Sequence, residues 1–105
     1  MRLQDKVVAI TGAASGIGRA TVDVCLEEGA RLVLGDLDAS GLSELEGIGG
    51  PDRPALVVPT DVTRLAACQA LVDAAVQRWG RIDAVINCAG ILQGAFVPVD
   101  ELDEE

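Results

Sequence analysis

The sequence predicts an α/β protein built around a doubly wound parallel sheet. Four short apolar runs are spread along its 105 residues, and stretches with a helical spacing of apolar residues lie between them. The runs do not alternate polar with apolar residues, which indicates strands that are buried on both faces, as in a parallel sheet. Strands that alternate with helices predict a series of βαβ units with right-handed crossovers.

The predicted strands are the apolar runs, which are rich in β-branched residues and cover residues 7–10, 32–34, 56–58 and 84–86. The first predicted helix covers residues 17–28. Ser15 is expected to cap its N-terminus and Gly29 to end it. Its apolar stripe is formed by Ile17, Ala20, Val24 and Cys25.

Two further helices are predicted between the later strands. A weak helical pattern covers residues 39–48, where Gly41 and Gly47 each cost about 1 kcal/mol relative to alanine. A stronger pattern covers residues 64–79, with Thr63 as its N-cap and Gly80 as its end. One face of this last helix carries Leu65, Cys68, Val72, Ala75, Val76 and Trp79.

The first strand-to-helix turn is rich in glycine. In a doubly wound sheet, ligands bind at the carboxyl ends of the strands, where such turns lie. Gly12 permits a tight turn, Gly16 permits close approach of the backbone to a bound group, and Gly18 permits a helix to pack near a strand. The helix that follows offers unpaired N–H groups to a pyrophosphate, and Ser15 adds a hydroxyl. The alternative is a glycine-rich loop that binds no ligand. The position of the turn between a buried strand and an amphipathic helix argues against this alternative.

An acidic residue follows the second predicted strand. Asp36 lies 24 positions after Gly12 and 18 after Gly18, close to the spacing at which a carboxylate binds the ribose diol of a dinucleotide. A carboxylate there would repel a 2′-phosphate, and no Lys or Arg lies at positions 13–15 or 37–40 to attract one. NAD is therefore favoured over NADP. The alternative, an N-cap for the next helix, suits Asp38 better than Asp36.

The third and fourth turns also carry small or polar residues. Asp61 could accept a hydrogen bond from an adenine amino group, with the Val62 N–H donating to the ring, or it could cap the next helix; these alternatives remain open. Asn87 could tie neighbouring strands together, and the small residues Ala89 and Gly90 could let the backbone lie against a ligand. An ordinary tight turn is the alternative there.

Taken together, the four turns resemble the short-chain dehydrogenase/reductase family. The matching motifs are Thr-Gly-x-x-x-Gly-x-Gly at 11–18, Asp36, Asp-Val at 61–62 and Asn-x-Ala-Gly at 87–90. The ordered set covers essentially the whole chain. It implies a Rossmann-type sheet of about four strands in the order 3-2-1-4, with flanking helices and a bound nicotinamide dinucleotide.

The resemblance also implies which residues meet the cofactor. Those on the pyrophosphate side would be Gly12, Ser15, Gly16, Ile17 and Gly18. Those beside the adenosine ribose and the adenine would be Asp36, Leu37, Asp61 and Val62. Those near the middle of the cofactor would be Asn87, Ala89 and Gly90.

The catalytic residues of the family have no counterpart here. Its members use a Ser and a Tyr-x-x-x-Lys in the second half of the domain, whereas this chain has no Tyr, and its one Lys, Lys6, precedes the first strand. We therefore interpret residues 1–105 as the N-terminal part of a single NAD-binding domain whose catalytic half is absent. In that strand order the run at 84–86 is an exposed apolar edge, which predicts a homo-oligomer or other self-association.

Composition narrows the partners and the location. Seventeen Asp and Glu against eight Lys and Arg give a net charge of −9, which disfavours nucleic acid and anionic membrane surfaces. No apolar run reaches the roughly 18–20 residues of a membrane span. The chain has no His, which excludes a His metal site or His-based triad within it. Cys25, Cys68 and Cys88 lack Cys-x-x-Cys spacing, and they predict reduced thiols in a cytoplasmic protein.

The function predicted from these features is the NAD-binding portion of an oxidoreductase. Hydride would pass between NAD and a small alcohol or carbonyl substrate, with the chemistry supplied by residues outside this chain. A non-catalytic dinucleotide-binding or interaction module is the alternative, favoured by the missing Tyr and Lys. A fragment of an S-adenosylmethionine-dependent methyltransferase is a third candidate, and the three-residue gap between Gly12 and Gly16 argues against it.

Overall fold

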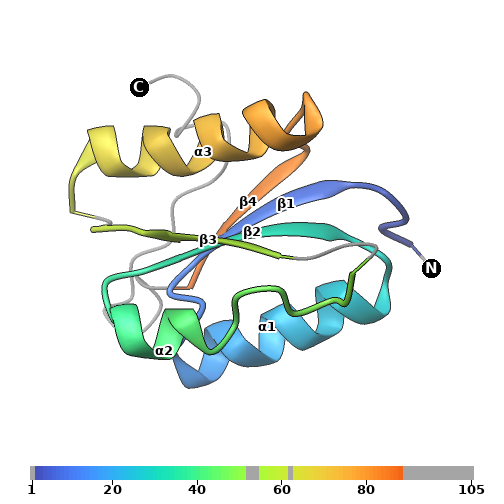
Figure 1. The fold of residues 1–105 in the computed structure, drawn as a ribbon, viewed down its shortest axis with the longest axis horizontal. Helices are drawn as coiled ribbons and strands as arrows, with labels where there is room; N and C mark the ends of the chain where they lie inside the picture. Colours follow the sequence, from blue (N-terminus) through green and yellow to red (C-terminus); the bar gives the residue numbers. More distant parts are fainter. Residues whose placement is uncertain (1, 52–54, 62, 89–105) are drawn as a thin grey trace.

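The chain folds around a four-stranded parallel sheet in the order β3-β2-β1-β4 (Figure 1). A computed structural model describes residues 2–51, 55–61 and 63–88. The elements follow the predicted alternation: β1 (Val7–Thr11), α1 (Gly16–Glu27), β2 (Arg31–Asp36), α2 (Ala39–Ser43), β3 (Leu56–Pro59), α3 (Leu65–Trp79) and β4 (Ala84–Asn87). The predicted fold class and strand order are confirmed.

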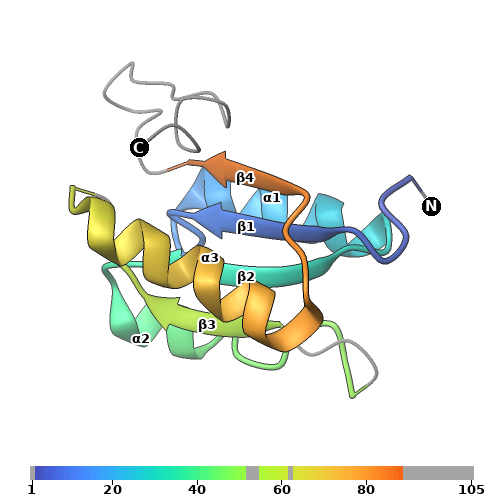
Figure 2. The same ribbon diagram turned by 90° about the horizontal axis from the view of Figure 1, so that it is seen from above.

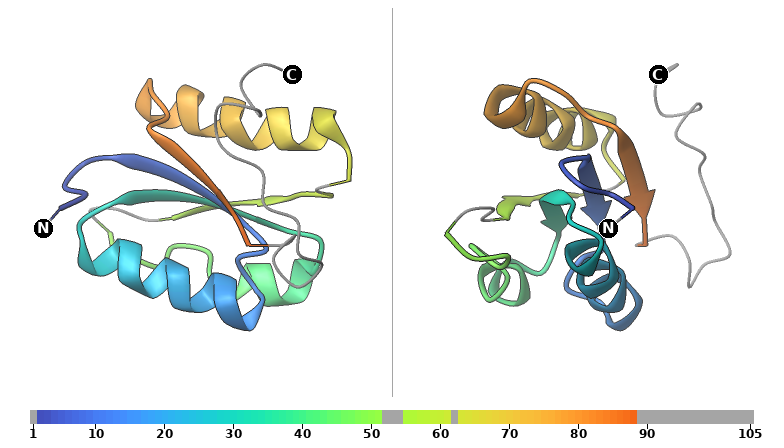
Figure 3. Two further views of the ribbon diagram at one scale, coloured as in Figure 1. Left: turned by 180° about the vertical axis from the view of Figure 1, so that it is seen from behind. Right: turned by 90° about the vertical axis from the view of Figure 1, so that its right-hand side faces the viewer.

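The sheet divides the molecule into three layers. Helices α1 and α2 cover one face and α3 covers the other, as Figures 1 and 3 show. Alternate residues of β1 point to opposite faces: Val8 and Ile10 pack in the core under α1 and α2, while Val7 and Ala9 pack in the core under α3. Because both faces are covered, β1 is buried along its whole length, and this explains its continuous apolar sequence.

The strand register aligns the carboxyl ends of the four strands at the same end of the sheet. Residues 7–11 of β1 pair with residues 31–35 of β2, and Thr11 lies opposite Asn87 of β4. Asp36 of β2 lies opposite Pro59 of β3. Figure 2 shows the strands running in the same direction, with β3 and β4 at opposite edges of the sheet.

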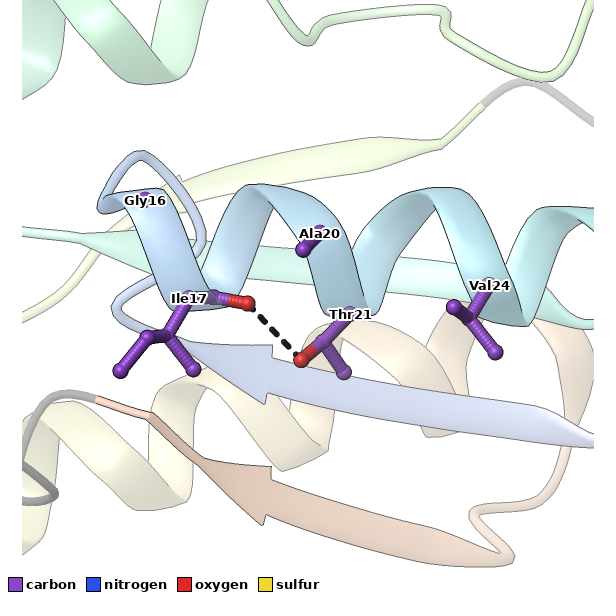
Figure 4. A pocket seen from close by; sticks show the side chains of 5 residues that line it. All are labelled: Gly16, Ile17, Ala20, Thr21 and Val24. Carbon is purple, nitrogen blue, oxygen red and sulfur yellow. Dashed lines mark hydrogen bonds between the residues drawn. The ribbon is translucent and has the colours of Figure 1, made fainter.

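The face that α1 turns toward the sheet differs from the predicted stripe. Its buried residues are Gly18, Val22 and Cys25. Ile17 is 44% exposed and Val24 is 58% exposed, so of the predicted stripe Cys25 alone is buried. Ile17, Ala20 and Val24 instead line a shallow hollow along α1 (Figure 4).

The buried face of α3 agrees with the predicted one in part, since Ala75 is buried and Trp79 packs against the core. Leu71 and Ala75, one turn apart, are its buried residues. Leu65 and Val76, two members of the predicted apolar face, are 50% and 43% exposed. Leu71 and Ala75 pack in one core with residues of β1 and β2.

The helix ends agree with the sequence in part. Ser15 is the N-cap of α1, and Gly80 ends α3 with a left-handed φ of 78°. The prediction that Thr63 caps α3 is wrong, because the N-cap position is Arg64 and no side chain caps there. Helix α2 is also shorter than the predicted 39–48, although Leu42 and Leu45 are both buried.

Candidate functional site

The glycine-rich turn after β1 is held by hydrogen bonds within itself. Gly12 has a φ of 70°, which an L-residue adopts with strain. The Ser15 hydroxyl donates to the Gly12 carbonyl oxygen at 2.6 Å and accepts from the Gly18 N–H at 3.0 Å. Ser15 therefore joins the start of the turn to the first turn of α1, and its cap fixes where the helix begins.

The other two glycines of the turn face different surroundings. A Cβ atom on Gly18 would lie 1.9 Å from the carbonyl oxygen of Gly12, so the helix packs here at a distance that glycine alone permits. A Cβ atom on Gly16 would meet nothing within 4 Å. The first residue of α1 thus faces open space, where the helix N-terminus presents N–H groups and a partial positive charge.

The carboxylate of Asp36 reaches the glycine-rich turn. Its Oδ2 accepts from the Ala14 N–H at 2.9 Å, and its Oδ1 accepts from the Asp38 N–H at 2.8 Å. Asp36 is half-buried, while the adjacent Leu37 is 74% exposed. Two features that lie 22 residues apart in the sequence therefore form one structural unit at the ends of β1 and β2.

Asp38, and not Asp36, caps the next helix. The Oδ1 atom of Asp38 accepts from the Gly41 N–H and from the Ser40 hydroxyl, both at 3.1 Å. These hydrogen bonds, that of Gly41 first, hold the pKa of the Asp38 carboxyl below its ordinary value. The Asp36 carboxylate is therefore not engaged as the N-cap of α2.

Asp61 lies at the end of β3, ahead of α3. Its Oδ1 accepts from the Thr63 hydroxyl at 2.6 Å and from the Thr63 N–H at 3.0 Å, and these bonds lower the pKa of the carboxyl. Thr63 precedes the N-cap Arg64, so the carboxylate closes a local turn and does not bond to the amides of the helix. Val62 lies outside the described residues.

Asn87 connects the ends of β1 and β4. Its Oδ1 accepts from the Thr11 hydroxyl at 2.9 Å, and the next residue, Cys88, donates its backbone N–H to the Thr11 carbonyl oxygen. The side chain of Thr11 is almost fully buried. Ala89 and Gly90, the other two residues that the sequence pattern indicates in this turn, lie outside the described residues.

The structure adds residues that the sequence did not point to. Ala14 contributes a backbone N–H, for which no side-chain signal exists. Gly35 lies against the buried Thr60, since a Cβ on Gly35 would be 2.6 Å from the Thr60 hydroxyl oxygen. A glycine next to the carboxyl end of a buried strand could have indicated this close approach.

Burial disfavours the reactive thiolate form at two of the three cysteines, Cys25 and Cys68. Cys25 and Cys88 are buried and Cys68 is half-buried, and none of the three is joined in a disulfide. Burial, and secondly the nearby Cys88, raises the pKa of the Cys25 thiol. Burial likewise raises the pKa of Cys68. A thiol with a raised pKa is largely protonated at neutral pH and is a poor nucleophile.

Comparison with known proteins identifies the family. The family model for short chain dehydrogenases matches residues 6–105. The chain belongs to the short-chain dehydrogenase family. An oxidoreductase of Staphylococcus saprophyticus is 41% identical over 102 residues, which are 97% of this chain and 41% of that protein. A 3-oxoacyl-[acyl-carrier-protein] reductase of Thermotoga maritima is 41% identical over 101 residues, which are 92% of this chain and 40% of the reductase.

A solved structure is similar to this chain in fold as well as in sequence. The short-chain dehydrogenase/reductase of Burkholderia phymatum, crystallised in complex with NAD, superposes with a TM-score of 0.73 at 35% identity. The match covers 81% of this chain and 31% of that one. This chain thus spans about two fifths of the length of the curated family members it matches. No helix among the described residues is long and apolar enough to cross a membrane.

Proposed function

We propose that this chain binds NAD at the end of the sheet where the carboxyl ends of the four strands lie. The observation that carries the proposal is the 2.9 Å hydrogen bond between the Asp36 carboxylate and the Ala14 N–H. It places the Asp36 carboxylate, which we propose to bind the ribose, beside the glycine-rich turn, and this arrangement suits a dinucleotide. The open space at Gly16 leaves room for the pyrophosphate at the start of α1.

The proposed cofactor contacts are those that the sequence suggested. Asp36 and Leu37 would contact the adenosine ribose, and Asp61 would contact the adenine. The residues proposed for the pyrophosphate are Gly12, Ser15, Gly16, Ile17 and Gly18, and those proposed for the remaining contacts are Val62, Asn87, Ala89 and Gly90. When bound, the nicotinamide would supply hydride chemistry, and the residues of this chain would hold and orient the dinucleotide.

The preference proposed is for NAD over NADP. A 2′-phosphate would bring negative charge next to the Asp36 carboxylate, whose two oxygens already accept hydrogen bonds from the backbone. Arg19, the first basic residue after the glycine-rich turn, forms an ion pair with Asp23 at 2.7 Å. Charge repulsion without a compensating cation therefore favours the dinucleotide that lacks the phosphate.

The wider function is proposed at the level of the family. We propose that the chain is the cofactor-binding part, residues 1–105, of an oxidoreductase that acts on a small alcohol or carbonyl compound. The sequence contains no Tyr, so the proton-transfer chemistry would be supplied outside it. A non-catalytic dinucleotide-binding module is the second candidate, favoured by the same missing residue. The three cysteines of the chain form no disulfide, which fits a reducing compartment that we propose to be the cytoplasm.

A self-associated state is part of the proposal. Within the described residues β4 pairs with β1 alone, and the apolar surface of α1 formed by Ile17, Ala20 and Val24 is exposed nearby (Figure 4). Exposed strand edges and apolar patches promote association. Sedimentation over a range of concentrations tests this part, and a monomer at every concentration would contradict it.

Titration calorimetry on the full chain tests the cofactor. We expect NAD to bind at least about tenfold more tightly than NADP, a difference of ~1.4 kcal/mol. S-adenosylmethionine serves as the control ligand and is expected not to bind. The absence of NAD binding, or binding of S-adenosylmethionine in its place, would contradict the proposal, and turnover of an alcohol with NAD would contradict the assignment of the chemistry to residues outside the chain.

A further inference from the structure

The glycine-rich turn is attached to β2 at two consecutive backbone groups. The Ala13 N–H donates to the Gly35 carbonyl oxygen at 3.1 Å, and the Ala14 N–H donates to Asp36 Oδ2 at 2.9 Å. The first attachment is made between backbone atoms and does not involve the side chain at position 36. The second depends entirely on the side chain of Asp36.

The same carboxylate also holds the start of α2. Its other oxygen, Oδ1, accepts from the Asp38 N–H at 2.8 Å. Helix α2 in turn lies against the turn, since a Cβ on Gly41 would be 3.0 Å from the Cβ of Ala14. Asp36 therefore stands where three segments meet: the glycine-rich turn, the end of β2 and the first turn of α2.

We propose that Asp36 is a positioning residue for the glycine-rich turn, in addition to the ribose contact on which the proposed function rests. By holding Ala14, its carboxylate fixes the residue that precedes the α1 N-cap Ser15. The turn would then be set for a pyrophosphate before any ligand arrives. Loss of the carboxylate should weaken the binding of a dinucleotide even when that dinucleotide has no hydroxyl for Asp36 to contact.

The chemistry of the carboxylate makes this role separable from ribose binding. An ionised carboxylate has two acceptor oxygens with a spare lone pair on each, so it can hold two N–H groups and still accept from ribose hydroxyls. An asparagine has one acceptor oxygen and an NH₂ donor. It could still bond to ribose hydroxyls, which both donate and accept, but it would turn its NH₂ group toward one of the two backbone N–H donors.

The experiment compares Asp36→Asn with Asp38→Asn in the full chain. Each substitution removes one negative charge, and the positions are two residues apart. The hydrogen bonds from the Gly41 N–H and the Ser40 hydroxyl both go to Oδ1 of Asp38, so asparagine can keep them. In the ligand-free protein we expect the amide that the asparagine NH₂ group faces, that of Ala14 or that of Asp38, to exchange with deuterium about tenfold faster in Asp36→Asn, as for the loss of a charge-assisted hydrogen bond. Both amides should stay within about twofold of wild type in Asp38→Asn.

A second measurement separates positioning from contact. The probe is an NAD analogue whose adenosine ribose is 2′,3′-dideoxy and so offers no hydroxyl to Asp36. We expect Asp36→Asn to bind it at least about fivefold more weakly than either wild type or Asp38→Asn does. Equal affinity of Asp36→Asn and wild type for this analogue would overturn the proposal.

One test of the proposal uses the wild-type protein without ligand, so it depends neither on the folding of a variant nor on NAD binding. In wild type, a scalar coupling across the hydrogen bond between the Ala14 nitrogen and the Asp36 carboxyl carbon is expected, and its absence would overturn the proposal. Failure of wild type to bind NAD would contradict the proposed function. The exchange rates, which are measured without ligand, would still decide whether Asp36 holds the turn.

Discussion

Gly18 lies against Gly12 so closely that a Cβ atom on Gly18 would be 1.9 Å from the Gly12 carbonyl oxygen. The start of α1 is thereby packed directly onto the end of β1. A Cβ atom on Gly16, two residues earlier, would meet nothing within 4 Å. The glycines of the turn thus divide between two physical requirements, close packing at Gly18 and open access at Gly16.

Gly18→Ala should destabilise the fold. A methyl group at 1.9 Å from a backbone oxygen cannot be accommodated unless α1 or the turn shifts, and overpacking of this kind typically costs about 1–3 kcal/mol. The measurement is the free energy of unfolding in urea. An unchanged midpoint would show that α1 moves away from β1 without cost.

Gly16→Ala is expected to leave the fold stable and to weaken NAD binding. Its Cβ meets no protein atom, and alanine favours helix over glycine, so the free energy of unfolding should stay the same or rise by up to about 1 kcal/mol. If the pyrophosphate lies at this position, the added methyl should weaken NAD binding at least about fivefold, or ~1 kcal/mol. Calorimetry on both glycine variants checks this, and full NAD affinity in Gly16→Ala would argue against a pyrophosphate there.

Ser15→Ala tests the cap of α1. The variant loses the hydroxyl that accepts from the Gly18 N–H and donates to the Gly12 carbonyl oxygen, and loss of an N-cap costs about 0.5–2 kcal/mol. Ser43→Ala is the matched control. That hydroxyl is exposed and bonds to the Ser40 carbonyl oxygen, so its loss should cost less than about 0.5 kcal/mol. Equal destabilisation by the two variants would refute the cap.

The strands and their order could be predicted because continuous apolar runs and family-like turns leave few arrangements. The helix faces could be predicted only in part: of the predicted residues, Cys25 and Ala75 are buried. Ile17, Ala20 and Val24 follow a helical spacing, but the buried residues of α1 are Gly18, Val22 and Cys25. Which stripe meets the sheet depends on how α1 is rotated, and that is set by the contact of Gly18 with the turn, a tertiary constraint.

Residues of the candidate site could be predicted from the sequence where the type and spacing of a side chain indicate a role. Asp36 has a distance from the glycines that points to a ribose. The hydrogen bond from Ala14 has no such signal, because its donor is a backbone N–H and any residue except proline provides one. The alternatives left open for Asp61 likewise depend on its position in the fold, where its carboxylate meets Thr63 outside the helix.

Leu71→Ala should be among the costliest substitutions in α3. Leu71 is 1% exposed and belongs to the core between α3 and the sheet, so the lost contacts and the remaining cavity should cost about 2–5 kcal/mol. Leu65→Ala, the same change at the half-exposed start of the helix, should cost less than about 1 kcal/mol. Urea unfolding of both variants checks which face of α3 is buried, and the reverse order would contradict the packing described.

Acid should weaken the fold partly through Asp83. The Arg81 guanidinium first, and then the Val7 N–H at 2.8 Å, hold the pKa of the Asp83 carboxyl below its ordinary 3.8. The unfolded chain therefore binds more protons than the native one between these two values, and the free energy of unfolding increases with pH there. The contribution is fully present well above pH 3.8 and is lost as the pH falls through 3.8 toward the lowered value.

The variant that tests this is Asp83→Asn. The pH-dependent contribution is missing from it, so it should be less stable than wild type at pH 7 and should lose less stability on acidification. Urea unfolding across the range from neutral pH to below the ordinary carboxyl pKa of 3.8 measures both differences. An equal loss of stability in the two proteins would show that Asp83 is not one of the groups responsible, because a carboxyl whose pKa is the same in the folded and unfolded chain contributes nothing to the slope.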